Sequence, residues 1–289
     1  MLRTSCHTHN RYCDGKGEIA EYGGAALAAG LEALGVSSHS PLPFHDDSAM
    51  RPDALPAHCA DVARLRYAHR DRLRIHLSLE FDYVPECADR VWEMIAPYPF
   101  DYLIGSVHFV GTGAGGVPSA YDLSGRGFER GVKELFAGDI RQMVGEYYSR
   151  VRALVAWGRV AILGHLDRIK LWNRGNRHFD EDEPWYCNEV EAALRACAHA
   201  GIIVELNTSG WRHAVRVKRC CARPAVPALR CCVMVDGASS PTDPDPTDPP
   251  GASKTRARSG TRRPGIASNE MKRHGAVEVR RCLGCTERG

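Results

Sequence analysis

The chain has 289 residues, of which 44% are hydrophobic and 25% charged, with a formal net charge of +3. These are the values of an ordinary globular protein with room for one large domain or two small ones. No apolar run approaches the roughly 18 residues of a membrane helix, and the polar N-terminus is unlike a signal peptide, so we expect a cytoplasmic protein with no membrane partner. Its twelve cysteines are then expected to be thiols.

Short apolar runs alternate with longer segments of helical pattern up to about residue 212. The predicted strands are residues 2–8, 33–38, 74–81, 102–109, 160–166 and 201–207. The predicted helices are residues 18–29, 52–71, 85–95, 127–157 and 183–200. Strand–helix repeats of this kind predict an α/β, barrel-like fold that is short of one or two strands.

Residues 213–289 differ sharply in composition from the rest of the chain. They hold 15 Lys and Arg against 7 Asp and Glu, whereas residues 1–212 hold 23 against 28. They carry no Phe, Trp or Tyr, but six of the twelve cysteines and eight of the seventeen prolines. Such a segment has too little apolar surface to bury. We therefore expect a domain over residues 1–212 and a disordered, basic, low-complexity tail over 213–289.

Polar side chains lie at the C-terminal ends of the predicted strands, where an α/β barrel gathers its chemistry. The endings are Cys6-His7-Thr8-His9, Ser38-His39-Ser40, Glu80, Ser106-Val107-His108, Gly164-His165-Leu166-Asp167 and Glu205-Leu206-Asn207-Thr208. Histidines recur at the same end of successive strands, which a solvated surface does not require. The set therefore favours a common polar site.

His7 and His9 are two residues apart, which on a strand places both imidazoles on one face, where they can hold one ion. Imidazole and carboxylate together suit Zn, Mn or Fe. A carboxylate such as Glu80 can bridge two ions that activate water on a phosphate ester. A lone histidine is more often a surface residue, so the metal-site interpretation depends on histidines recurring at the ends of successive strands. The histidines without such placement are assigned to surface or packing, and these are His58, His69, His76, His178, His199, His213 and His274. His45, in a loop after His39, stays open.

Six segments, in order, resemble the PHP (polymerase and histidinol phosphatase) family of metal-dependent phosphoesterases, most closely its histidinol-phosphate phosphatase branch. They are residues 6–17, 37–41, 79–83, 99–109, 164–170 and 205–212. The resemblance implies a distorted (β/α)7 TIM-like barrel, here incomplete at its C-terminus. It also implies up to three divalent metal ions. The implied ligands are His7, His9 and Glu80 for the first ion, Glu80, His108 and His165 for the second, and Asp14 and His39 for the third.

The reaction implied by the resemblance is hydrolysis of L-histidinol phosphate to L-histidinol and phosphate, in L-histidine biosynthesis. A metal-bound hydroxide held by Glu80, His108 and His165 would attack the phosphorus in line, without a covalent intermediate. The implied partner is this small phosphomonoester.

Three further side chains of the matching segments are candidates for supporting roles. Arg212 is a candidate phosphate clamp, because a guanidinium matches phosphate oxygens in a bidentate manner. Lys170 is a weaker candidate for substrate binding, and a solvated surface charge is the better interpretation of it. Asp167 either orients the His165 loop or caps a helix.

The C-terminal part departs from the family pattern. The first and third ions each expect one more ligand from a late Asp-x-His motif, and no such motif occurs in residues 213–289. Nothing after Asn207 resembles a buried strand, and Val233-Met234-Val235 is the only short apolar run. Missing ligands and exposed sheet edges predict a destabilised protein with weak metal affinity and low activity.

Three explanations compete for residues 213–289. The first is a frameshift near residues 213–219, which the Arg-, Pro-, Ala- and Cys-rich composition favours and which translation of the other two frames would test. The second is a basic tail that binds nucleic acid, although without aromatic residues it offers no stacking platform. The third is a small zinc module, although only Cys282 and Cys285 have a usual ligand spacing.

Two alternatives to the histidinol-phosphatase interpretation remain at this point. One is another phosphoesterase of the same family, acting on a different monoester or on nucleic-acid ends. The other is an inactive domain whose basic tail binds nucleic acid. A panel of substrates distinguishes the first alternative from a histidinol phosphatase. Salt-dependent retention on nucleic acid would support the second alternative.

Overall fold

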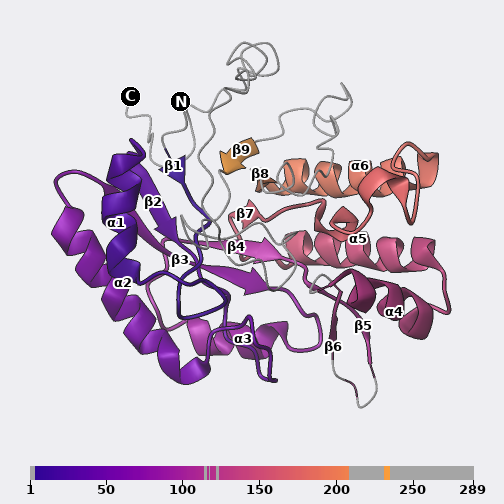
Figure 1. Cartoon of the computed structure of the whole chain (residues 1–289), viewed down its shortest axis with the longest axis horizontal. Helices are drawn as coiled ribbons and strands as arrows, with labels where there is room; N and C mark the ends of the chain where they lie inside the picture. The colour runs from indigo at the N-terminus through magenta and orange to yellow at the C-terminus, as the bar shows by residue number, and fades with distance from the viewer. Residues whose placement is uncertain (1–3, 114–115, 117, 122–123, 208–230, 235–289) are drawn as a thin grey trace, which may run out of the picture. The chain divides into compact units, whose positions relative to one another are not determined.

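Seven strands form one parallel sheet in the computed structural model, in the order β1-β2-β3-β4-β7-β8-β9 (Figure 1). They are Thr4–Ser5, Ala33–Val36, Arg74–Asp82, Tyr102–Ser106, Ile162–Leu163, Ile203–Asn207 and Cys231–Met234. The sheet order follows the chain order, as in a barrel of successive strands. Among the described residues no pairing joins β9 to β1. The predicted α/β fold is confirmed as a curled parallel sheet that forms an incomplete barrel.

The structure describes residues 4–113, 116, 118–121, 124–207 and 231–234. The chain divides into two units, Met1–Ser239 and Ser240–Gly289, and every described residue belongs to the first. Arg212, His213 and His274 lie outside the described residues, as do Cys282 and Cys285. The predicted disorder of the tail, and the explanations offered for it, stay predictions.

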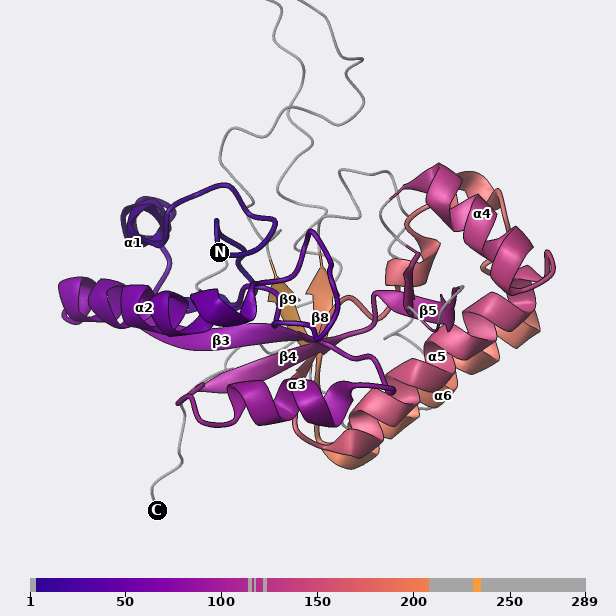
Figure 2. The same cartoon turned by 90° about the horizontal axis from the view of Figure 1, so that it is seen from below.

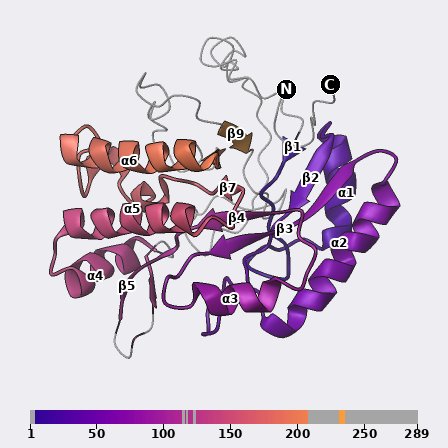
Figure 3. The same cartoon turned by 180° about the vertical axis from the view of Figure 1, so that it is seen from behind.

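Six α-helices occur in the described part of the chain. They are α1 Ile19–Ala28, α2 Leu55–His69, α3 Ala88–Ile95, α4 Gly125–Leu135, α5 Ile140–Trp157 and α6 Pro184–Ala200. Helix α1 packs on α2, and α5 packs on α6. Figures 2 and 3 show α1 and α2 beside β2 and β3, while α4, α5 and α6 gather at the other end of the sheet. None of these helices is long and apolar enough to cross a bilayer.

Two apolar clusters stabilise these layers. The larger one joins the sheet to α3, α5 and α6, and its fully buried members include Leu79, Phe81 and Leu154. The smaller one lies under α1 and α2, where Val62 packs with residues of β2 and β3 such as Leu34. The strands are buried on both sides and read as nearly continuous apolar runs, which is why the sequence pattern located them.

One long helix was predicted over residues 127–157, and this prediction is wrong, because two helices occupy the segment. Helix α4 ends at Leu135, and Ala137 and Gly138 then take positive φ angles of 51° and 84°. The Asp139 carboxylate accepts hydrogen bonds from the backbone N–H groups of Arg141 and Gln142, as an N-cap does. A left-handed glycine followed by an aspartate cap ends one helix and begins the next.

The predicted strand over residues 102–109 is also corrected. Strand β4 ends at Ser106, and a separate antiparallel hairpin follows, made of β5 Phe109–Thr112 and β6 Pro118–Ala120. The Tyr121 backbone N–H donates to the carbonyl of His108 at 3.2 Å, and the Tyr121 hydroxyl donates to the carbonyl of Val107 at 3.0 Å. The hairpin thus fixes the backbone of His108 from outside the parallel sheet.

Strand β9 corrects the expectation that no strand follows Asn207. Residues Cys231–Met234 pair in parallel with Val204–Asn207 of β8. The short apolar run noted in the sequence overlaps this strand, but three residues carry too little periodicity to predict a strand. The sheet therefore continues past the sixth predicted strand.

The six cysteines of residues 4–207 are all free thiols, as predicted for this part of the chain. Cys13 differs in environment, because its Sγ lies 3.3 Å from Nδ1 of His9. Burial raises the pKa of the Cys13 thiol, but the hydrogen bond with His9 and the positive charges of His9 and His39 together lower that pKa to about 7.

Gly35 in β2 gives a test of the packing between the first strands. A Cβ at this position would overlap the hydroxyl of Tyr102 and would lie 2.8 Å from the carbonyl oxygen of Cys6, to which that hydroxyl donates. We expect Gly35→Ala to destabilise the protein by ~1–3 kcal/mol, because the crowded neighbours include backbone. Gly24→Ala is the matched control, since a Cβ there meets nothing within 4 Å and sits in α1.

Urea denaturation of both variants measures the effect. Gly24→Ala should leave stability equal or raise it by up to ~1 kcal/mol, because alanine is the better helix former. If Gly35→Ala is as stable as the wild-type chain, the close packing of Tyr102 on β1 and β2 is wrong.

Candidate metal centre

The predicted metal ligands converge at the C-terminal ends of the parallel strands. His7 and His9 follow β1, His39 follows β2, Glu80 lies in β3, and His108 and His165 follow β4 and β7. His39 and Glu80 form an isolated parallel bridge, with Ser40 N–H donating to the Glu80 carbonyl at 2.8 Å. Side chains that are up to about 160 positions apart in the chain therefore face one another because the strands are parallel and in register.

Glu80 lies at the centre of the cluster and is 1% exposed. Its Oε2 is 3.1 Å from Nε2 of His7 and 3.1 Å from Nε2 of His9. Its Oε1 is 2.9 Å from Nε2 of His165 and 3.7 Å from Nε2 of His108. One carboxylate oxygen thus faces each histidine pair, which is the arrangement of a carboxylate that bridges two ions.

Within each pair, the ring nitrogens face each other across a distance that fits a shared ion. The two Nε2 atoms of His7 and His9 are 3.1 Å apart, and those of His108 and His165 are 3.2 Å apart. Two nitrogens at ~2.0–2.1 Å from one tetrahedral ion lie about 3.3 Å apart. The donor atoms therefore fit divalent ions that accept imidazole and carboxylate ligands.

A third group of donors forms around His9, Asp14 and His39, whose candidate ligand atoms lie within 4.8 Å of one another. Nδ1 of His9 is 3.1 Å from Oδ1 of Asp14. The rings of His9 and His39 are 4.6 Å apart between centroids. Asp14 is the exposed member of this group, so the third group opens toward solvent, whereas the two groups around Glu80 are buried except for the half-buried His9.

Burial and charge act in opposite directions on the first histidine pair. Burial alone lowers the pKa of His7, but the negative charges of Glu80 and Glu205 outweigh it and raise that pKa to about 9. His165 behaves differently, because burial dominates over its contact with Glu80 and lowers its pKa. Near neutral pH His7 of the first pair is therefore protonated, whereas His165 of the second pair is neutral and has a nitrogen lone pair available for an ion.

The carboxylates of the cluster are held in their ionised forms. Burial raises the pKa of Glu80, but His7, His39 and His108 together hold it well below the usual range. The pKa of His39 is lowered by burial and raised to about 10 by Asp82 and Glu80. Positive and negative groups thus compensate one another in a buried site, as they must in a low dielectric.

Two carboxylates contact the predicted ligands without having been assigned a role from the sequence. Asp82 accepts from His39 and His108, and Glu205 accepts from His7 and from the backbone N–H of His165 at 2.8 Å. Asp82 is two residues after Glu80 in β3, so strand periodicity places it on the same face and could have pointed to it. Glu205 was noted at a strand end, but its partners His7 and His165 follow the first and fifth predicted strands, which are distant from it in the sequence.

Lys170 and Asp167 form an ion pair beside the cluster. Lys170 is 1% exposed, and its Nζ is 3.0 Å from Oδ2 of Asp167 and 3.5 Å from Oε2 of Glu181. The interpretation of Lys170 as a solvated charge is therefore wrong. Asp167 stands at the start of the short helix Arg168–Lys170 but makes no side-chain cap bond, which removes the capping interpretation. Arg212 lies outside the described residues.

The remaining histidines of the described part of the chain take no part in the candidate ligand groups, as predicted. His58 is fully buried between α2 and the sheet and packs edge-on against Tyr12. His45, which the sequence left open, is exposed and lies 3.6 Å from Asp47. Histidines of this chain thus pack in the core, lie on the surface or join the cluster, according to their position in the fold.

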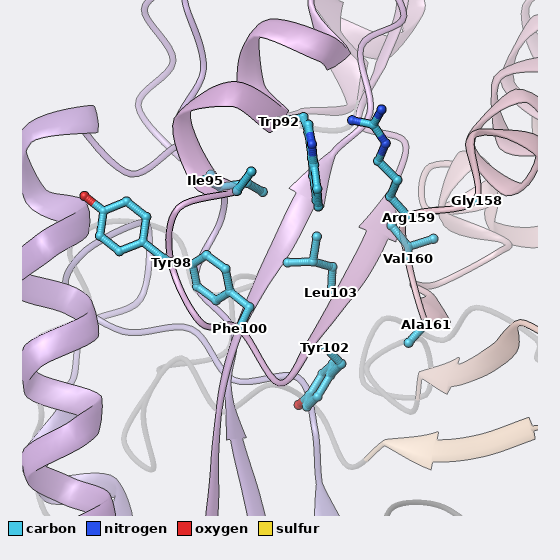
Figure 4. A pocket seen from close by; sticks show the side chains of 11 residues that line it. Trp92, Ile95, Tyr98, Phe100, Tyr102, Leu103, Gly158, Arg159, Val160 and Ala161 are labelled. Carbon is cyan, nitrogen blue, oxygen red and sulfur yellow. The ribbon is translucent and has the colours of Figure 1, made fainter.

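A cavity of about 350 Å³ lies near the opposite ends of the strands from the histidine cluster (Figure 4). Its walls include Trp92 and Ile95 of α3, Leu103 at the start of β4, and Arg159 and Val160 before β7. None of the residues that line it is a histidine or a carboxylate. The candidate ligand groups therefore lie at the C-terminal ends of the strands and not in this cavity.

The PHP domain family model matches residues 5–209, which include every residue of the cluster. The chain belongs to the PHP domain family. A Deinococcus radiodurans protein named probable histidinol-phosphatase is 31% identical over 212 residues, which are 72% of this chain and 74% of that protein. The recognition made from the six segments is confirmed.

Two solved structures share the fold of this PHP domain. A provisionally assigned histidinol phosphatase of Listeria monocytogenes superimposes with a TM-score of 0.66 at 18% identity, covering 73% of this chain and 85% of that one. The histidinol phosphate phosphatase of Lactococcus lactis, solved with zinc, L-histidinol and phosphate, gives a TM-score of 0.55 at 20% identity, covering 71% and 73%. The incomplete barrel is therefore a PHP fold.

Proposed function

We propose that this chain hydrolyses a small phosphomonoester, L-histidinol phosphate, to L-histidinol and phosphate with the help of divalent metal ions. The observation that carries the proposal is the bridging position of Glu80. One of its oxygens faces the His7–His9 pair, and the other faces the His108–His165 pair. A buried carboxylate between two histidine pairs is the arrangement of a two-ion phosphoesterase site.

The side chains that would hold the ions are those implied by the family. They are His7, His9 and Glu80, then Glu80, His108 and His165, and finally Asp14 with His39. Bound ions would supply charge neutralisation on the phosphate oxygens and a water of lowered pKa. The chain's own contribution is to orient the ring nitrogens toward Glu80, to exclude bulk water from the buried groups and to leave the Asp14 side open for substrate entry.

The substrate is proposed from the relatives. The Deinococcus protein and the Lactococcus structure carry histidinol-phosphatase names, and the latter is a complex with zinc, L-histidinol and phosphate. Such an activity places the chain in L-histidine biosynthesis, and a biosynthetic phosphatase of this kind is expected in the cytoplasm. Arg212 remains the candidate phosphate clamp. Lys170 is the weaker one, because its ammonium group is buried between two carboxylates.

A phosphate-release assay on L-histidinol phosphate, with Mn²⁺ or Zn²⁺ added, tests the proposal. The variant His7→Ala is expected to lose activity by about 100-fold or more, because a ligand of the bridged pair is gone. His199→Ala is the matched control, since His199 is exposed on α6 and remote from the cluster. It should keep wild-type turnover.

A panel of other phosphomonoesters and of nucleic-acid ends belongs to the same assay. Preference for another ester would retain the phosphoesterase and replace the substrate. Absence of metal-dependent turnover on every ester, from folded protein that retains ions, would contradict the proposal and leave the inactive domain with a nucleic-acid-binding tail.

A further inference from the structure

Two buried carboxylates, Asp82 and Glu205, each contact two of the proposed ligand segments. Asp82 is 2% exposed and Glu205 3%. We propose that both are positioning residues, which fix the orientation of the imidazoles around Glu80 so that their metal-facing nitrogens point toward the ions. This inference rests on the proposed function, because it assigns the groups that hold the ligands of that same site.

Asp82 joins the strands on either side of β3. Its Oδ2 is 2.9 Å from Nδ1 of His39, and its Oδ1 is in close contact with Nδ1 of His108. These two histidines belong to different ion groups, the third and the second. The same three side chains could in principle enclose an ion, but Asp82 faces Nδ1 of His108, whereas Nε2 of the same ring faces Glu80. Hydrogen bonding therefore explains Asp82 better than metal ligation does.

Glu205 makes the corresponding link across the strands β1, β7 and β8. Both of its oxygens lie 3.2 Å from Nδ1 of His7. Its Oε2 also accepts the backbone N–H of His165 at 2.8 Å. The ring of His165 has no such support, since its buried Nδ1 has no hydrogen-bond partner in the described structure. Glu205 thus holds His7 by its ring and His165 by its backbone.

The chemistry of a carboxylate explains why these positions carry acids. An ionised carboxylate only accepts hydrogen bonds, so the ring nitrogen facing it must carry the proton. With Nδ1 protonated, a neutral imidazole leaves Nε2 as its lone-pair donor, and Nε2 is the atom that faces Glu80 in His7 and His108. Ligand histidines with such outer carboxylates hold their ions 10–100-fold more tightly, as an order of magnitude.

Because each carboxylate contacts two ligand segments, its substitution should weaken two particular ion sites. Asp82→Asn presents an amide to two N–H groups, and the amide can accept from both only through one oxygen, so His39 or His108 loses its partner. Glu205→Gln weakens the hold on His7 and on the His165 backbone. The first variant should therefore weaken the second and third ion sites, and the second variant the first and second.

Titration of the metal-free full chain with Co²⁺, followed by its visible absorption, is the test. Asp82→Asn and Glu205→Gln should each bind Co²⁺ about 10–100-fold more weakly than the wild-type chain, with altered absorption bands. Asp101→Asn is the matched control. This carboxylate contacts Arg66 and the backbone N–H of Leu77 near the opposite end of β3, and its loss should leave Co²⁺ binding and the spectrum unchanged.

A second measurement needs no variant and so does not depend on variant folding. In the Zn²⁺-loaded wild-type chain labelled with ¹⁵N-histidine, the Nδ1–H protons of His7, His39 and His108 should give hydrogen-bonded, downfield NMR signals. Wild-type protein that binds no ion would contradict the proposed function. Wild-type protein that binds ions but lacks these signals, or variants that bind Co²⁺ with unchanged affinity and spectrum, would overturn the positioning role alone.

Discussion

Glu80→Gln is expected to remove both tight metal binding and phosphatase activity, with a loss of about 100-fold or more in each. The carboxylate has one oxygen toward each histidine pair, and the amide would keep only one acceptor. Its NH₂ group would face ring nitrogens that have to donate their lone pairs to an ion. Because the two pairs share this side chain, one substitution should affect both ions at once.

The matched control for this prediction is Glu93→Gln on the exposed side of α3. Metal content by atomic emission and phosphate release from L-histidinol phosphate are the two measurements. Circular dichroism establishes that Glu80→Gln is folded. A folded Glu80→Gln chain with metal content and turnover within twofold of the wild type would show that Glu80 does not bridge ions.

The second large effect is expected in the number of ions that bind tightly. The family resemblance implies that the first and third ions each take a ligand from a late Asp-x-His motif, which residues 213–289 lack. By the same resemblance, the set of Glu80, His108 and His165 would need no ligand from that motif. Titration of the metal-free chain should therefore show one tight site and further sites weaker by about 100-fold or more.

Competition between protons and metal ions for His7 and His39 also weakens the first and third ion sites relative to the second. Without ions the pKa values of His7 and His39 are raised to about 9 and about 10, so near pH 7 an ion must displace a proton from each. The pKa of His165 is lowered by burial, so its nitrogen is free at that pH. Affinity at the weaker sites should rise as the pH rises toward 9–10, while the tight site changes little above neutral pH.

Paired variants check this assignment by isothermal titration with Zn²⁺. His165→Ala should abolish the tight phase, whereas His39→Ala should remove a weak phase and spare the tight one. Three ions of equal affinity, or a tight phase that survives His165→Ala, would contradict the order of the sites.

The sequence predicted the strands, and the meeting of the candidate ligands at their ends, because both depend on local pattern. His7, His39, His108 and His165 each follow an apolar run, and parallel strands bring their ends together whatever the loop lengths. The alternation along β3 that exposes Glu80 and Asp82 on one face is also local, although only Glu80 was assigned a role.

What the sequence did not predict depends on contacts between distant segments. The role of Glu205 follows from where His7 and the His165 backbone lie in space, and no local pattern encodes that meeting. Lys170 is charged and follows a turn, which suggested a surface position, but Asp167 and Glu181 compensate its charge and allow burial. The break between α4 and α5 depends on the backbone at Gly138 and the cap at Asp139, within an otherwise continuous helical pattern.

Anomalous diffraction from crystals of the Zn²⁺-loaded chain, measured at the zinc absorption edge, tests the central claim most directly. We expect a peak among Glu80 Oε1, His108 Nε2 and His165 Nε2, and at higher Zn²⁺ a second peak beside Oε2, His7 and His9. A chain that binds Zn²⁺ with no peak at Glu80, its carboxylate still bonded directly to the imidazoles, would contradict the bridged metal centre.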